Sequence, residues 1–212
     1  MPPQLIPLTS LREKTDQWFQ RAAAALLGQL PCRPGCSACC IGPFPITMLD
    51  AVTLQEGVAQ LPAAKRDAVV TRAAEQIMQM EAAYPLLRQT PYLDGWRDAD
   101  IDRLVEQFRT MPCPALGHEG RCELYEHRPL VCRSMGIPTE EGGTVQGACP
   151  VQNALPVVRL PAWTGIEGEQ LAEYEAQAME ACRAEQGCDG EEVLLPYGFL
   201  PVSWSRGTAM SR

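Results

Sequence analysis

Eight of the ten cysteines stand in two groups, and thiols concentrated in this way can bind a metal. The groups are Cys32, Cys36, Cys39 and Cys40 in the stretch CRPGCSACC, and Cys113, Cys122, Cys132 and Cys149 further along the chain. A core needs no such density of thiols, because small apolar side chains would fill these positions as well. Soft thiolates suit zinc and iron-sulfur clusters and disfavour magnesium and calcium. The pattern therefore predicts a thiolate metal site.

The first group predicts an irregular loop that organises itself around metal. Cys36 and Cys39 are separated by two residues, so one tight turn could aim both sulfurs at a single ion. Pro34 and Gly35 disfavour a helix in this stretch. Side chains of neighbouring residues tend to diverge, so we expect Cys39 and Cys40 to serve two different centres, or one to bind metal while the other packs.

The second group is too widely spaced to form a site by itself. Eight, nine and sixteen residues lie between its successive cysteines, which exceeds the spacing of a single knuckle. This half must therefore fold before its thiols can converge. The 72 residues between the two groups have a helical pattern, and we expect helices to bring two ligand-bearing loops together in space.

The order of the cysteines resembles the CxxCxxCC proteins of the YkgJ type, to which zinc or iron chelation through eight cysteines is ascribed. The resemblance covers about residues 31–150 and rests on CRPGCSACC, a later Cys-Pro, the stretch GRCELYEHRPLVCR and a last cysteine. It names no reaction, so catalytic residues stay unknown. Carried over position by position, it implies the metal ligands Cys32, Cys36, Cys39, Cys40, Cys113, Cys122, Cys132 and Cys149.

Several centres and functions are compatible with eight thiolates. Two groups of four fit two zinc ions or two cubane iron-sulfur clusters, and a single cluster with the other cysteines packed nearby is also compatible. A metal-dependent or redox enzyme would need an open coordination position. A thiol-disulfide oxidoreductase could use Cys36 and Cys39, although such pairs normally open a helix in a βαβ setting. Because no G-x-S-x-G, HExxH, Walker or dinucleotide motif occurs, we expect a metal-binding protein rather than an enzyme.

The other cysteines and the two histidines are left out of the predicted site. Cys182 lies on the apolar face of a predicted helix, which favours core packing, and Cys188 falls outside the family pattern. His118 and His127 could bind zinc, but each has a charged neighbour, which favours a solvated loop position. Three arginines beside ligand candidates could offset the negative charge of the thiolates or simply be exposed in loops. They are Arg121, Arg128 and Arg133.

Composition predicts one domain over residues 1–212, with a cysteine-cluster core at about 31–150. A chain of 212 residues with 46% hydrophobic content can bury a core. The net charge of −8 disfavours nucleic acid as a partner, and no apolar run approaches the roughly 20 residues that span a bilayer. The start MPPQLIPLTS resembles no export signal, so we expect a cytoplasmic location. The expected partners are metal ions, and a protein partner stays unknown.

The fold class that the apolar periodicity predicts is mostly α: a small helical bundle with irregular cysteine loops and at most a short β-hairpin. Helices 10–29 and 167–186 are expected to pack around the cysteine core. Thr9 or Ser10 could cap the first helix, and Thr47 the second. The predicted helices span about 10–29, 47–60, 62–84, 98–108 and 167–186.

Two shorter segments have their own signals. Alternation between Gly120 and Tyr125 predicts a short strand, and Pro129 can open a helical turn that carries Cys132. The apolar tail VLLPYGFLPVSW is predicted to pack as an extended segment against the helices, with binding of a partner as the alternative.

Overall fold

The structure is a computed structural model that describes residues 7–26, 30, 35–141, 144–146, 161–186 and 190–201. Cys32, Cys149 and Cys188 lie outside these residues. The chain divides into two compact units, which are described separately below. Unit 1 comprises Met1–Cys40, Gly117–Arg121 and Pro129–Ala178, and unit 2 comprises Ile41–Leu116, Cys122–Arg128 and Met179–Arg212.

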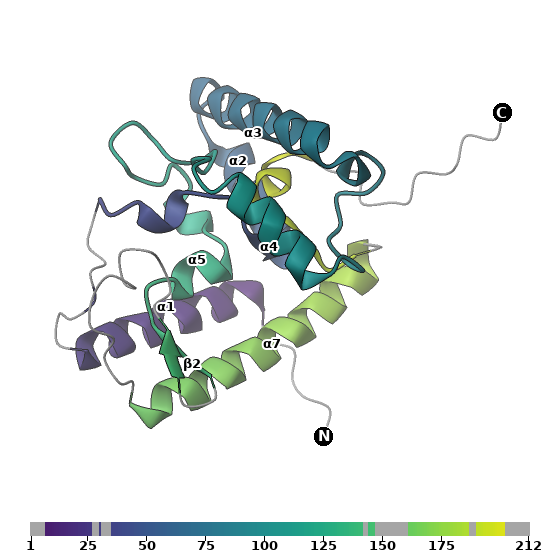
Figure 1. Ribbon diagram of the computed structural model, residues 1–212. Coiled ribbons are helices and arrows are strands. Elements are labelled where there is room, and N and C mark those ends of the chain that lie inside the picture. The colour runs from purple at the N-terminus through teal and green to yellow at the C-terminus, as the bar shows by residue number, and fades with distance from the viewer. Residues whose placement is uncertain are drawn as a thin grey trace. The chain divides into compact units, whose positions relative to one another are not determined.

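The predicted mostly-α fold class is confirmed (Figure 1). The α-helices in the described part of the chain are α1 (Leu8–Ala25), α2 (Met48–Gln60), α3 (Ala63–Ala83), α4 (Asp98–Gln107), α5 (Leu130–Ser134) and α7 (Ala162–Gln186). Short 3-10 helices are η1 (Ala38–Cys40), η2 (Pro85–Arg88), η3 (Tyr125–His127) and η4 (Leu195–Phe199). None of the described helices combines the length and the apolar character that crossing a bilayer requires.

The described strands form two antiparallel pairs. The hairpin of β2 (Thr139–Glu141) and β3 (Thr144–Gln146) joins neighbouring segments. The other pair joins β1 (Pro45–Thr47) to β4 (Glu192–Leu194), with Ile46 opposite Val193, and was not predicted. The strand predicted from Gly120 to Tyr125 is wrong. The bridge there pairs Leu116 with Cys122, and η3 begins at Tyr125.

The starts of α1 and α7 differ from the sequence expectation, whereas the start of α2 agrees with it. Thr47 caps α2 as predicted, because its Oγ1 accepts a hydrogen bond from the backbone N–H of Asp50 at 3.3 Å. The predicted cap of α1 is wrong, since this helix begins at Leu8 after Pro7 and therefore has Thr9 and Ser10 in its first turn. Helix α7 begins at Ala162, five residues earlier than predicted.

The core of unit 1 forms around the indole of Trp18 in α1. Trp18 is 8% exposed, and its Nε1–H donates to the backbone carbonyl of Thr164 in α7 at 3.1 Å. The cluster contains Trp18, Ala22 and Ile137, with Phe19, Leu30, Trp163 and Leu171 packed against it. This contact joins the first described helix to the start of α7, which lies more than a hundred residues later in the chain.

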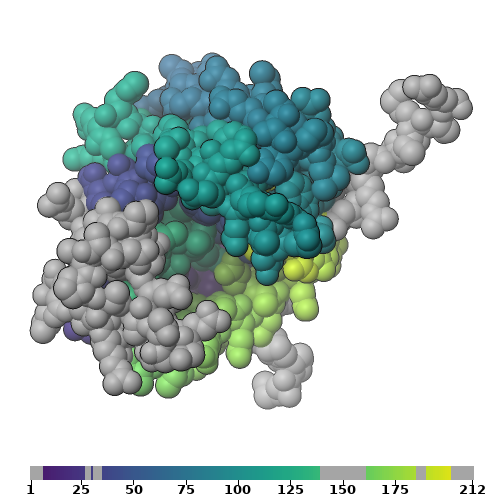
Figure 2. Space-filling view, in the orientation of Figure 1, coloured from purple at the N-terminus to yellow at the C-terminus, as the bar shows by residue number. Residues whose placement is uncertain are grey.

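The core of unit 2 forms around the C-terminal segment. Val193, Leu194, Leu195 and Phe199 are at most 2% exposed, and η4 packs against α2 and α3. Packing of the tail against the helices is thus confirmed for its described part, although only β4 is extended and η4 is helical. In the space-filling view of Figure 2, atoms of α3 are visible at the surface.

Two polar or reactive groups are buried in unit 2. The hydroxyl of Tyr197 donates to Oε1 of Glu81 at 3.3 Å, and burial together with this carboxylate holds the pKa of Tyr197 well above its usual range. Cys182 in α7 is 8% exposed, which confirms the prediction that it packs in a core.

Candidate metal centre

The described part of the first cysteine loop, residues 35–40, is irregular apart from one 3-10 turn, as predicted. Cys36, Cys39 and Cys40 belong to unit 1 and are half-buried. The backbone N–H of Cys40 donates to the carbonyl of Ser37 at 2.9 Å, which closes the 3-10 turn η1. Successive residues of a 3-10 helix are rotated by about 120°, so this turn suits the expectation that the side chains of Cys39 and Cys40 diverge.

Cys113 and Cys122 lie close to each other in a tight segment of unit 2. The backbone N–H of Leu116 donates to the carbonyl of Cys113 at 2.9 Å, and Leu116 forms an antiparallel bridge with Cys122. The N–H of Glu123 donates to the carbonyl of Ala115 at 2.8 Å. Both cysteines are half-buried. The backbone thus brings two cysteines of the second group to one turn.

The tip of this turn, Gly117–Arg121, belongs to unit 1 and contacts the first cysteine loop. The N–H of Gly117 donates to the carbonyl of Arg121 at 2.8 Å, and Gly120 has a φ of 71°, which favours glycine. A Cβ on Gly120 would meet the carbonyl oxygen of Gly35 at 3.4 Å, so the two backbones approach closely. Gly35 directly precedes Cys36 in the chain.

A second backbone contact in unit 2 joins the segments that flank the cysteines. Ile41 forms an antiparallel bridge with Pro112, and the N–H of Gly42 donates to the carbonyl of Met111 at 2.6 Å. Gly42 has a φ of 91°, and a Cβ there would lie 3.4 Å from the carbonyl oxygen of Arg109. Glycine is therefore the residue that lets the chain turn away just after the first cysteine group.

The remaining described candidate ligand, Cys132, is carried by α5. This helix follows Pro129, as predicted, and Cys132 is half-buried in unit 1. The next residue, Arg133, is only 5% exposed and forms an ion pair with Asp16 of α1. Helix α1 packs on α5 and, through this ion pair, fixes the orientation of the turn that holds the thiol.

The other charged residues near the cysteines have different surroundings. Arg121 is exposed, whereas the guanidinium of Arg128 lies 3.9 Å from the ring centroid of Tyr125. His118 is exposed, as expected for a solvated loop. His127 is half-buried against α2, where a Cβ on Gly57 would lie 2.6 Å from its Cβ, so solvation of this histidine is only partial.

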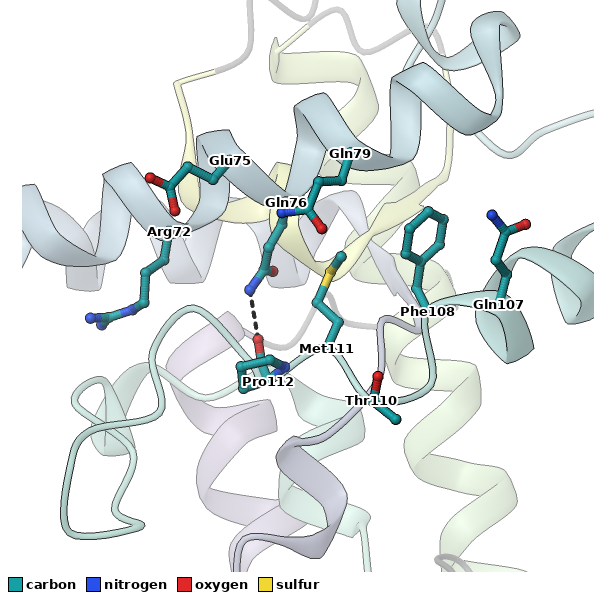
Figure 3. Close-up of a pocket in the computed structure, with 9 residues that line it drawn as sticks. All are labelled: Arg72, Glu75, Gln76, Gln79, Gln107, Phe108, Thr110, Met111 and Pro112. Atoms are coloured by element: carbon teal, nitrogen blue, oxygen red, sulfur yellow. Dashed lines mark hydrogen bonds between the residues drawn. The ribbon is translucent and has the colours of Figure 1, made fainter.

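A separate pocket in unit 2 has a volume of about 320 Å³ (Figure 3). No cysteine or histidine lines it, so it is not the predicted thiolate site. The lining residues are Arg72, Glu75, Gln76, Gln79, Gln107, Phe108, Thr110, Met111 and Pro112. Sequence reasoning gave no role to Arg72 and Gln76, although both contact the backbone beside Cys113.

The described residues do not form a complete metal site. Within residues 7–26, 30, 35–141, 144–146, 161–186 and 190–201, no three His, Cys, Asp or Glu side chains form a group that could hold a metal ion. Two of the eight predicted ligands lie outside these residues, and the other six belong to different units. The chemistry of the donors nevertheless suits zinc or iron, because all eight are cysteine thiols, and the six that the structure describes are half-buried. The eight-ligand set stays a prediction.

Comparison with known proteins decides the family. The sequence model of the CxxCxxCC family, described as "Putative zinc- or iron-chelating domain", matches residues 31–150, more than half of the chain. The chain belongs to the CxxCxxCC family. This confirms the family resemblance over the same residues and supports binding of zinc or iron by the CxxCxxCC domain. No curated protein and no solved structure matches the chain.

Proposed function

We propose that this CxxCxxCC protein binds a zinc or iron-sulfur centre through the thiolates of both cysteine groups. The bound centre stabilises the folded arrangement of the helices. The observation that carries the proposal is the bridge between Ile41 and Pro112. Ile41 directly follows Cys40, and Pro112 directly precedes Cys113. The bridge therefore joins the residue that follows the first cysteine group to the residue that precedes the first cysteine of the second group.

The approach of Gly120 to Gly35 supports the same convergence from a second pair of segments. Gly35 precedes Cys36 directly, and Gly120 precedes Cys122 by two residues. Two independent backbone contacts thus join residues next to the first cysteine group to residues next to the second. A binding site assembled from distant segments needs such contacts before its ligands can meet.

Family order supplies the rest of the proposed ligands: Cys32, Cys39, Cys132 and Cys149. When bound, the metal would supply coordinate bonds between loops that 72 residues separate. The chain's own part is to present deprotonated sulfur and to limit access of water, which half-burial of the described thiols favours. A single domain in the cytoplasm suits this role, since thiols stay reduced there.

Metal analysis of anaerobically purified protein tests the proposal. We expect either colourless protein with stoichiometric zinc, or brown protein with iron and matching sulfide. Cys113→Ser should lower the metal content to about half in a chain with two four-thiolate sites, and further in a chain with one, because the site that contains Cys113 loses a ligand it requires. Cys182→Ser is the matched control, since this buried thiol lies outside the family pattern and its loss should leave the metal in place. Metal-free, folded protein with reversible thiol oxidation would instead favour a thiol-disulfide oxidoreductase.

A further inference from the structure

Helix α3 donates hydrogen bonds to the backbone on both sides of Cys113. Nε2 of Gln76 donates to the carbonyl of Pro112 at 2.7 Å, as Figure 3 shows. Nε of Arg72 donates to the carbonyl of Pro114 at 2.8 Å. The two side chains are four positions apart and therefore lie on the same face of the helix. One helix face thus contacts the peptide groups before and after a single cysteine.

Hydrogen bonds hold the backbone at Cys113 and at the residues on both sides of it. Three successive carbonyls, those of Pro112, Cys113 and Pro114, each accept a hydrogen bond, the middle one from the N–H of Leu116 at 2.9 Å. Proline at 112 and at 114 also restricts φ on both sides. The direction in which the Cys113 thiol leaves the backbone is therefore set before any ligand binds.

Stability alone does not explain the presence of Gln76. Its side chain is only 7% exposed, and its Oε1 is buried without a hydrogen-bond partner among the described residues. A buried carbonyl oxygen without a partner costs free energy, whereas an apolar side chain at this position would not. The hydrogen bond from Nε2 to the carbonyl of Pro112 is the contact that glutamine supplies here and that an apolar side chain of similar size would not.

We propose, on the basis of the proposed function, that Arg72 and Gln76 are positioning residues that hold Cys113 in the orientation that metal binding requires. Hydrogen bonds that orient metal ligands commonly change affinity by about 10- to 100-fold. The hydrogen bonds from Arg72 and Gln76 to the carbonyls of Pro114 and Pro112 are called the clamp below. The clamp orients Cys113 before the metal and the other thiolates bind.

Variants of the full-length, metal-loaded chain test the clamp. In Arg72→Met and Gln76→Met, alkylation of Cys113 by iodoacetamide, followed by mass spectrometry, should become about 10-fold faster or more as the metal is held less tightly. Arg66→Met and Gln79→Met on the same helix are matched controls, because both side chains are largely outside the core. Arg72→Lys keeps a donor for Pro114 and should restore most of the protection. Phe199→Leu loosens the core while leaving the side chains of Arg72 and Gln76 in place, and it reports the effect of lower stability.

Each outcome decides between the two proposals. A wild-type chain that carries no metal overturns the proposed function and, with it, the clamp. A metal-loaded wild-type chain whose Arg72→Met and Gln76→Met variants protect Cys113 equally well overturns the clamp alone. Loss of protection that Phe199→Leu reproduces at an equal drop in melting temperature also overturns it, because the clamp would then be no more than a part of the core.

Discussion

Removal of the metal by an anaerobic chelator is expected to lower the melting temperature by about 10 °C or more. Ligands that come together only in the folded chain turn the free energy of metal binding into free energy of folding. In a chain of this size each kcal/mol changes the melting temperature by about 2–4 °C, so a loss of only a few kcal/mol suffices. Circular dichroism during heating, before and after chelation, measures the change.

Re-addition of the metal is the control for this experiment and should restore the original melting temperature. Amide hydrogen exchange adds a local readout. Exchange should accelerate in the cysteine loop at Ala38–Cys40, whereas the buried segment Val193–Phe199 should stay protected, because its packing involves no thiolate. An unchanged melting temperature after verified loss of the metal would contradict a structural role for the centre.

Phe199→Ala is expected to have the largest effect of any change that leaves the cysteines intact. Phe199 is 1% exposed and lies in η4, which packs against α2 and α3. Truncation of a buried phenylalanine commonly costs about 3–5 kcal/mol, which corresponds here to a decrease of about 6–20 °C in the melting temperature. Urea unfolding measures the free energy of unfolding directly.

Leu86→Ala is the matched control for this prediction. Leu86 is 48% exposed in η2, so its truncation should change the free energy of unfolding by less than about 0.5 kcal/mol. Equal stability of the two variants would show that the C-terminal segment is not part of the core of unit 2.

The helices that local signals define were predictable. Thr47 supplies a cap, Pro62 precedes α3, and apolar residues recur at helical spacing between them and beyond. The early start of α7 was not predictable, since Gly165 and Gly168 lower helix propensity in its first turns. A tertiary contact holds this start of the helix, because Nε1–H of Trp18 donates to the backbone carbonyl of Thr164 at 3.1 Å.

Pairing between distant segments could not be predicted from local pattern. The strand expected between Gly120 and Tyr125 fails because the turn at Gly117–Arg121 leaves room for little more than the bridge between Leu116 and Cys122. The pairing of β1 with β4 joins segments that lie far apart in the chain. Nothing in the sequence of either three-residue strand specifies its partner. The sequence therefore predicted that the tail packs against the helices, but it did not predict the strand pairing.

The candidate ligands could be predicted from the order of the cysteines, whereas the side chains that hold the backbone beside Cys113 could not. Clustered thiols are visible in the sequence because few other roles require them. Arg72 and Gln76 are 42 and 36 positions away from the carbonyls they contact. Helix α3 has an apolar stripe, and the sequence pattern assigns Arg72 and Gln76 to its polar face. Their contact with the backbone of Cys113 becomes visible only in three dimensions.

X-ray absorption at the metal edge of the purified, full-length protein tests the central proposal most directly, because it reports the atoms bound to the metal. The account predicts a first shell of about four sulfur atoms per metal, at about 2.3 Å if the metal is zinc. A first shell made of nitrogen and oxygen at about 2.0–2.2 Å, with no sulfur, would contradict it.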